Sequence, residues 1–402
     1  MAVIDARMNR RAFTVLGAGV AVVAAVGTRR GVLAQDDATP GAQEAATPGA
    51  EGPGMPPIPE GATVVAEGLW NPTNLAFGDD GTLYVAENGV GGGGGPEAGV
   101  ATPNALGTPF PAPAALVPGQ VCAITPDGDV SVLAGDLGSV VGIAVAGTTL
   151  YVSTGGSSIG SGLAPNPEEN TVSAIDIATG AVTPIAELGS YEAANNPDGT
   201  DVNPNLYGLA VDAAGQIYVA DAGGNTIYKV DPATGSFDLF VVVPNLEQLT
   251  GATPTAEEQA QQAGPRQPVP TSVVIDDGGN IVVALLSEGW SGPSLLSFAP
   301  DGSYTVGVSG LSMIVNAALG PDGLLYVSQL TADFSGEQPA PGNVFRINTD
   351  GTTEAVVEGL FLPHGIVFDD DGNLYVSTNS IISGPDAPLG QVLRIDGVAP
   401  AA

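Results

Sequence analysis

The polar residues that could do chemistry in this 402-residue chain recur at two places in a repeated strand pattern. One place is the start of a short apolar strand, and the other is the end of the strand that follows it. Carboxylate, amide and hydroxyl oxygens bind small polar ligands and hard cations. We therefore expect a site for one small molecule or cation where the fold gathers these strand ends. The candidates at strand starts are Thr73, Asn74, Tyr207, Thr271, Asn316 and His364, and those at strand ends are Glu87, Asn88, Asp221, Gln329, Thr378 and Asn379.

His364 is the only histidine, so it is the only side chain that could serve as an imidazole base or an axial ligand. No Ser-His-Asp spacing and no histidine cluster accompanies it. The sequence favours a hydrogen-bonding residue that lines a channel over a catalyst, and it predicts no catalytic residue. The other polar candidates have the same alternative interpretation, as the lining of a wet channel.

The elements that must position these residues come from a repeat. The stretch 362–378, LPHGIVFDDDGNLYVST, reads as a short buried strand, a tight acidic turn with glycine, and an alternating strand. It recurs six times, and such a unit buries its faces only by packing against further copies. Each copy has a small residue at one position, and these positions lie 44 to 68 residues apart: Asn74, Gly142, Gly208, Ser272, Asn316 and Gly365.

An outer hairpin with an Asp-Gly or Thr-Gly turn follows five of the six copies, which gives four strands per unit. The sixth copy ends with a third strand at 391–395. The missing fourth strand is expected at 62–69, because ATVVAEGL matches the fourth-strand pattern TEAVVEGL at 353–360. Pairing of the two terminal strands removes an open sheet edge. The sequence therefore predicts an all-β, six-bladed β-propeller over residues 62–396, closed by its N- and C-terminal strands.

The longest connections should lie together on one face of this ring. In an up-and-down blade, the links between strands two and three and between blades emerge on the face opposite the tight turns. The long segments 88–118, 155–169, 189–203, 244–268 and 330–341 all belong to those links. Long loops on a rigid scaffold are where binding is usually found. We expect a small molecule or a protein to bind on this long-loop face.

The charge balance excludes some partners. The chain has 43 acidic residues and 9 basic ones, a formal net charge of −34. Such a surface cannot neutralise a phosphate backbone, so nucleic acid and anionic membranes are poor partners. Solubility is the simplest interpretation of the acidity, although diffuse negative charge also attracts divalent cations weakly.

The first 34 residues are typical of an export signal. Arg10 and Arg11 precede an apolar run at 14–26, and a small residue, Ala34, ends the segment. The arginine pair resembles a twin-arginine signal, which indicates export of a folded protein; an uncleaved anchor is the alternative. Residues 35–61, rich in proline, alanine and glycine, are expected to form a disordered linker, and 397–402 a tail. No other membrane-spanning segment is expected.

Segments 81–89 (GTLYVAENG), 207–212 (YGLAVD) and 218–225 (YVADAGGN) resemble the ScyD/ScyE family of exported, NHL-like propellers. The likeness covers about residues 62–396. It implies an extracytoplasmic binding or interaction scaffold, and it brings no catalytic residues to carry over.

Two alternatives of other classes stay open. Propeller lactonases of the senescence marker protein/gluconolactonase type hold a divalent ion, and that resemblance implies oxygen ligands for calcium from Glu87, Asn74, Asp221 and Asn316. That family places its glutamate at the start of the first inner strand, where this chain has Asn-Pro-Thr-Asn at 71–74. The other alternative is a redox propeller with a quinone-like cofactor.

Overall fold

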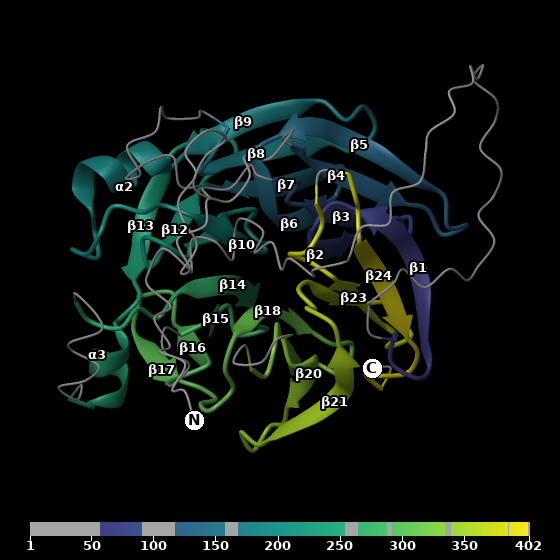
Figure 1. Ribbon diagram of the computed structural model, residues 1–402. Coiled ribbons are helices and arrows are strands. Elements are labelled where there is room, and N and C mark those ends of the chain that lie inside the picture. The colour runs from purple at the N-terminus through teal and green to yellow at the C-terminus, as the bar shows by residue number, and fades with distance from the viewer. Residues whose placement is uncertain are drawn as a thin grey trace, which may run out of the picture.

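The structure is a computed structural model that describes residues 57–90, 117–156, 168–253, 264–287, 292–333, 339–384 and 386–400. In these ranges the chain folds into six four-stranded antiparallel sheets, which stand around a common axis as blades (Figure 1). The predicted all-β, six-bladed propeller is confirmed.

Each of the first five blades uses four consecutive strands, and the sixth combines both ends of the chain. In blade order the strands are β2 (Pro72–Phe77), β3 (Leu83–Glu87), β4 (Gly119–Ile124) and β5 (Val130–Leu137); β6 (Ser139–Ala146), β7 (Thr149–Gly155), β8 (Thr171–Asp176) and β9 (Val182–Glu187); β10 (Leu206–Val211), β11 (Ile217–Asp221), β12 (Thr226–Val230) and β13 (Phe237–Val242); β14 (Pro270–Ile275), β15 (Ile281–Leu285), β16 (Leu295–Phe298) and β17 (Tyr304–Val306); β18 (Ile314–Leu319), β19 (Leu325–Gln329), β20 (Gly342–Ile347) and β21 (Thr353–Leu360); and β22 (Ile366–Phe368), β23 (Leu374–Thr378), β24 (Gly390–Ile395) and β1 (Ala62–Leu69).

The closure predicted for the ring is present. β1 pairs antiparallel with β24, from Ala62 opposite Ile395 to Leu69 opposite Gly390. The inner strands contact one another in blade order around the axis, and β22 contacts β2. Sheet hydrogen bonds therefore join the two ends of the described chain, and no blade edge is left open at the junction.

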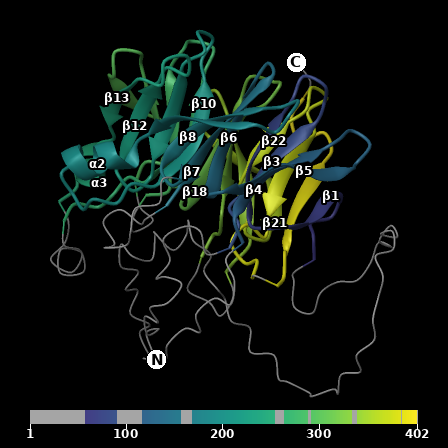
Figure 2. The same cartoon turned by 90° about the horizontal axis from the view of Figure 1, so that it is seen from above.

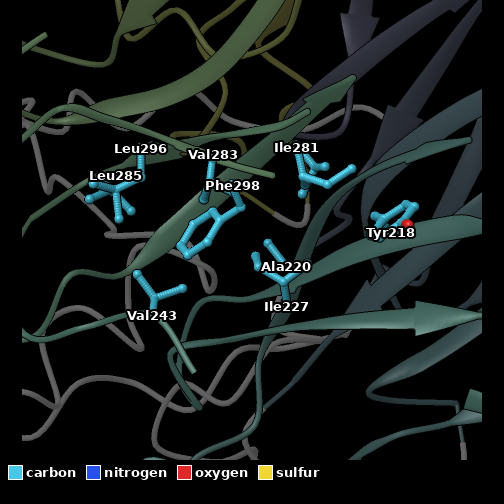
Figure 3. Close-up of a cluster of buried hydrophobic side chains, with 10 residues drawn as sticks. Tyr218, Ala220, Ile227, Val243, Ile281, Val283, Leu285, Leu296 and Phe298 are labelled. Atoms are coloured by element: carbon cyan, nitrogen blue, oxygen red, sulfur yellow. The ribbon is translucent and has the colours of Figure 1, made fainter. Parts of the chain in front are cut away.

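The blades are held together by apolar side chains between neighbouring sheets. Figure 3 shows the cluster between the third and fourth blades, where Ile227 and Tyr218 on one side meet Val283, Leu296 and Phe298 on the other. All five side chains are buried. Each sheet therefore buries one apolar face against the next, as the repeat requires.

Tight turns connect the two inner strands of each blade. In the turn between β22 and β23, one carboxylate oxygen of Asp369 accepts hydrogen bonds from the backbone amides of Asp371 and Asn373 at 3.1 and 2.9 Å. Gly372 follows with φ +82°, a conformation that glycine adopts without strain. These bonds are the physical basis of the acidic-glycine turn signature in the sequence.

Two short helices in the long connections were not predicted. They are α2 (Gly189–Asn195) and α3 (Leu246–Thr250). Figures 1 and 2 both place α2 beside β12 and β13. Tyr191 of α2 packs edge-on against Tyr228 and Phe237, with ring centroids 5.8 and 5.5 Å away.

The predicted signal at 1–34 and most of the predicted linker lie outside the described residues. Within the described residues, no helix is long and apolar enough to cross a membrane. In the predicted tail, the backbone amide of Ala399 donates a hydrogen bond to the carbonyl of Gly372 at 3.0 Å, and Ala399 is buried. That part of the tail packs against the sixth blade.

Candidate functional site

The candidate residues at strand starts lie at irregularities of the innermost strands. In the first five blades the register of the inner pair shifts there, for example between Pro72 and Leu75 and between Ile314 and Asn316. Such bulges re-aim side chains and often accompany sites. The residues at this register are buried in all six blades: Thr73, Val141, Tyr207, Thr271, Val315 and His364. The two valines were not among the candidates from the sequence, which are all polar.

Hydroxyl groups at this level connect neighbouring blades. Thr73 Oγ1 donates to the carbonyls of Ala86 and Val140 at 3.1 and 3.2 Å, and Thr271 Oγ1 donates to Ile314 at 2.9 Å. Among the described residues, serines do the same from second strands: Ser153 donates to the Tyr207 carbonyl, Ser328 to His364 and Ser377 to Thr73. These hydroxyls stabilise the ring, and their donor protons are not free for a ligand.

The next residues along two inner strands meet across the ring. Asn316 Nδ2 donates to Asn74 Oδ1 at 2.8 Å, joining the fifth and first blades. Asn316 Oδ1 accepts from the backbone amide of Ile366 at 3.1 Å, and both asparagines are buried. Each amide oxygen proposed as a metal ligand therefore already accepts a hydrogen bond.

Tyr207 and His364 meet between the third and sixth blades. The Tyr207 hydroxyl lies 2.6 Å from His364 Nε2, and the rings stack with centroids 5.5 Å apart. Burial lowers the pKa of His364 to about 3 and raises the pKa of Tyr207 above its usual value of 10.0. The imidazole is therefore neutral at physiological pH and is a weak base. Its Nδ1 atom is buried and has no hydrogen-bond partner.

The candidates at second-strand ends bond within or next to their own blades instead of meeting at the axis. Glu87 accepts from Gln120 Nε2 at 3.0 Å and from the Trp70 amide. Gln329 bonds to Ser312 and Asn343, and Asn379 donates to the Leu389 carbonyl at 2.8 Å. Asn88 accepts from Ser139 Oγ. Thr378 is the exception, because its buried hydroxyl has no partner.

Asp221 lies at the end of β11, where one carboxylate oxygen accepts three backbone amides. These are Asn205 at 2.8 Å, Gly223 at 3.2 Å and Gly224 at 2.8 Å. Burial nonetheless raises the pKa of Asp221 to about 6. Its second oxygen, Oδ2, is buried without a partner.

The four residues considered as calcium ligands therefore do not form one hydrogen-bonded group. The structure brings Asn74 and Asn316 into contact, whereas the carboxylates of Glu87 and Asp221 belong to two other hydrogen-bond networks, in the first and third blades. Across the described ranges, no three His, Cys, Asp or Glu side chains gather as a metal-binding group.

A polar cluster beside Asp221 was not predicted from the sequence. Glu192, on α2, is fully buried, and neither of its carboxylate oxygens has a hydrogen-bond partner. Burial and the nearby Asp221 raise the pKa of Glu192 to about 8. The only signal in the sequence was the acidic and amide-rich run 195–203, NNPDGTDVN, in one of the long connections.

Solved structures with a similar fold belong to proteins of different activities. A gluconolactonase from Xanthomonas campestris is 13% identical, with 83% of this chain and 88% of that chain covered and a TM-score of 0.50. The calcium-binding protein regucalcin from Agrobacterium tumefaciens is 13% identical (84% and 96% covered, TM-score 0.49), and virginiamycin B lyase from Staphylococcus aureus is 10% identical (83% and 98%, TM-score 0.46). At these identities the likeness shows the propeller fold alone. No protein-family model and no curated protein matches the sequence.

Proposed function

We propose that this protein is an extracytoplasmic scaffold of the ScyD/ScyE type that binds a small molecule or a protein on its long-loop face. The observation that carries the proposal is that polar side chains at the axis bond to one another and to backbone carbonyls. Asn74 bonds to Asn316, Tyr207 bonds to His364, and the threonine hydroxyls bond to backbone carbonyls. A fold whose axial polar groups hold the ring together leaves recognition to its loops.

The alternative, a metal-dependent lactonase, needs ligands and a base that converge on one substrate. The carboxylates proposed for that role have separate partners in two blades, and the single imidazole has a pKa of about 3. A base with that pKa contributes little at neutral pH. These contacts favour the scaffold over the hydrolase.

A photo-crosslinking amino acid on the long-loop face is expected to capture the partner in the exporting cell. Ala193 on α2 is an exposed position in a blade-to-blade connection. Asp127, exposed in the tight turn between β4 and β5, is the matched position on the opposite face. We expect a discrete adduct, measured by mass spectrometry, from position 193 and none from 127. Equal labelling from both positions would contradict a one-sided binding face.

Assays of the purified protein distinguish the scaffold from the two enzymatic alternatives. Purified protein with calcium, zinc or manganese is expected to hydrolyse D-glucono-1,5-lactone no faster than the metal alone, and to show no visible chromophore. Turnover that disappears in the Asn74→Ala variant would support the lactonase, and an absorbing cofactor would support the redox propeller.

Export is expected to depend on the arginine pair. The double substitution Arg10→Lys and Arg11→Lys keeps the charge of the segment but removes the guanidinium groups that mark a twin-arginine signal. We expect immunoblots of cell fractions to show at least about a tenfold loss of exported protein. Arg29→Lys with Arg30→Lys is the matched control and should leave export unchanged. Export of the first variant at the normal level would show that another route carries the protein.

A further inference from the structure

Two buried carboxylates of the third blade face the same point. If Gly224 carried a Cβ atom, that atom would lie 2.9 Å from Asp221 Oδ2 and 3.2 Å from Glu192 Cδ. The absent side chain leaves room between the two acids, one from α2 and one from the end of β11. Glu192 and Asp221 are both fully buried, and three of their four carboxylate oxygens have no hydrogen-bond partner.

Within the described ranges, no cationic side chain compensates this pair. A buried carboxylate without a partner is strongly unfavourable, so the charge must be paired, removed by protonation or bound to a metal. The described residues include four lysine or arginine side chains, and each has another neighbour: Lys229 lies over the Tyr218 ring, Arg266 pairs with Glu247, Arg346 with Glu354 and Arg394 with Asp396.

Further oxygens at the end of α2 and on β12 are buried without a partner. They are the Asn196 side-chain oxygen at the end of α2, and the hydroxyls of Thr226 and Tyr228 on β12. Burial, followed by the charges of Asp221 and Glu192, raises the pKa of Tyr228. Thr226 is the strand partner of Asp221 where β12 pairs with β11. Six of the nine unpartnered buried side-chain atoms in the described residues belong to these five side chains.

We propose that Glu192 and Asp221 bind a calcium ion in the third blade, with Asn196, Thr226 and Tyr228 as further candidate ligands. Calcium takes six to eight oxygen ligands in flexible geometry and accepts a carboxylate with both oxygens. Magnesium demands a smaller octahedral shell and keeps several waters, which fits a buried pair less well. Asp221 was a candidate metal ligand in the sequence, and here its ligand partner is Glu192 instead of Glu87.

The ion would connect α2, in the link between the second and third blades, to the end of β11. Glu192 belongs to the connection between the second and third blades, and Asp198 in the same connection accepts a hydrogen bond from Asn225 Nδ2 at 2.7 Å. Asn225 Oδ1 in turn accepts from the Val269 amide at 3.2 Å, at the start of the fourth blade. Calcium at Glu192 would thus order a segment that leads to a neighbouring connection on the proposed binding face.

Calorimetric titration of the chelator-treated, full-length protein with calcium chloride tests the proposal. The titration is run in 0.15 M salt, which screens weak attraction to the acidic surface. We expect one saturable site and a thermal midpoint that rises with calcium concentration. Magnesium at the same concentration should shift the midpoint less.

Three variants decide the outcome. Glu192→Gln and Asp221→Asn keep the side-chain shapes and remove one charge each, so calcium affinity should fall more than about tenfold. Glu187→Gln, which removes an exposed carboxylate just before α2, should bind calcium as the wild type does. No saturable binding by the wild type, or unchanged binding by Glu192→Gln, would overturn the proposal in favour of a shared proton.

Discussion

A chain that begins at residue 70, and so lacks β1, is expected to lose the folded ring. β1 supplies the fourth strand of the sixth blade, and its removal exposes the backbone groups of β24 along the whole edge. It also uncovers the apolar cluster to which Ala66 and Leu69 contribute between the sixth and first blades. We expect loss of the entire net stability, about 5–15 kcal/mol for a domain. Circular dichroism should show no cooperative thermal transition, and size-exclusion chromatography should show aggregates.

A chain that begins at residue 57 is the matched control, because it retains β1 and lacks only the preceding segment. It should be monodisperse and unfold cooperatively. If the chain without β1 were monomeric with a cooperative transition, the pairing of the terminal strands would not be what closes the ring.

Gly365→Ala is expected to force the sixth and first blades apart. The new Cβ atom would lie 2.3 Å from the Thr73 carbonyl oxygen and 2.6 Å from the Asn74 Cα atom. These are backbone atoms of the next blade, so no side-chain rotation relieves the contact. The hydrogen bond from the Gly365 amide to the Thr73 carbonyl, 3.0 Å long, would also be disturbed. We expect a loss of about 3 kcal/mol, measured by urea denaturation.

Two further substitutions test the explanation. Gly208→Ala places a Cβ atom 2.7 Å from the Thr271 carbonyl oxygen, at the same register between the third and fourth blades, and should cost about as much. Gly384→Ala meets no atom within 4 Å and should change stability by less than about 0.5 kcal/mol. Equal effects of Gly365→Ala and Gly384→Ala would show that chain entropy, and not blade contact, sets the cost.

The repeat could be predicted from the sequence because its causes are local. Alternating apolar residues fix which face of a strand is buried, and Asp and Gly fix the turns, as at Asp369 and Gly372. The small residue at one position of each copy was visible in the sequence. Only the structure gives its reason, which is the close approach of the next blade's backbone.

The candidate site could be predicted only in part. The starts of inner strands were expected to gather, and Asn74 does contact Asn316, as Tyr207 contacts His364. The ends of second strands were expected to join them, but Glu87 and Gln329 bond to neighbours at their own blades. Distance from the axis depends on strand order within the blade, and second strands lie one strand further out.

The sequence by itself determined the number of blades and the strand that closes the ring, because each follows from short-range pattern and turn chemistry. Only the tertiary structure decided which polar groups satisfy one another. Tyr207 and His364 are in contact although they are 157 residues apart in the sequence. Glu192 lies close to Asp221 because α2, which was not predicted from the sequence, packs against the third blade. Such pairings depend on the packing of whole elements, and local sequence carries no record of it.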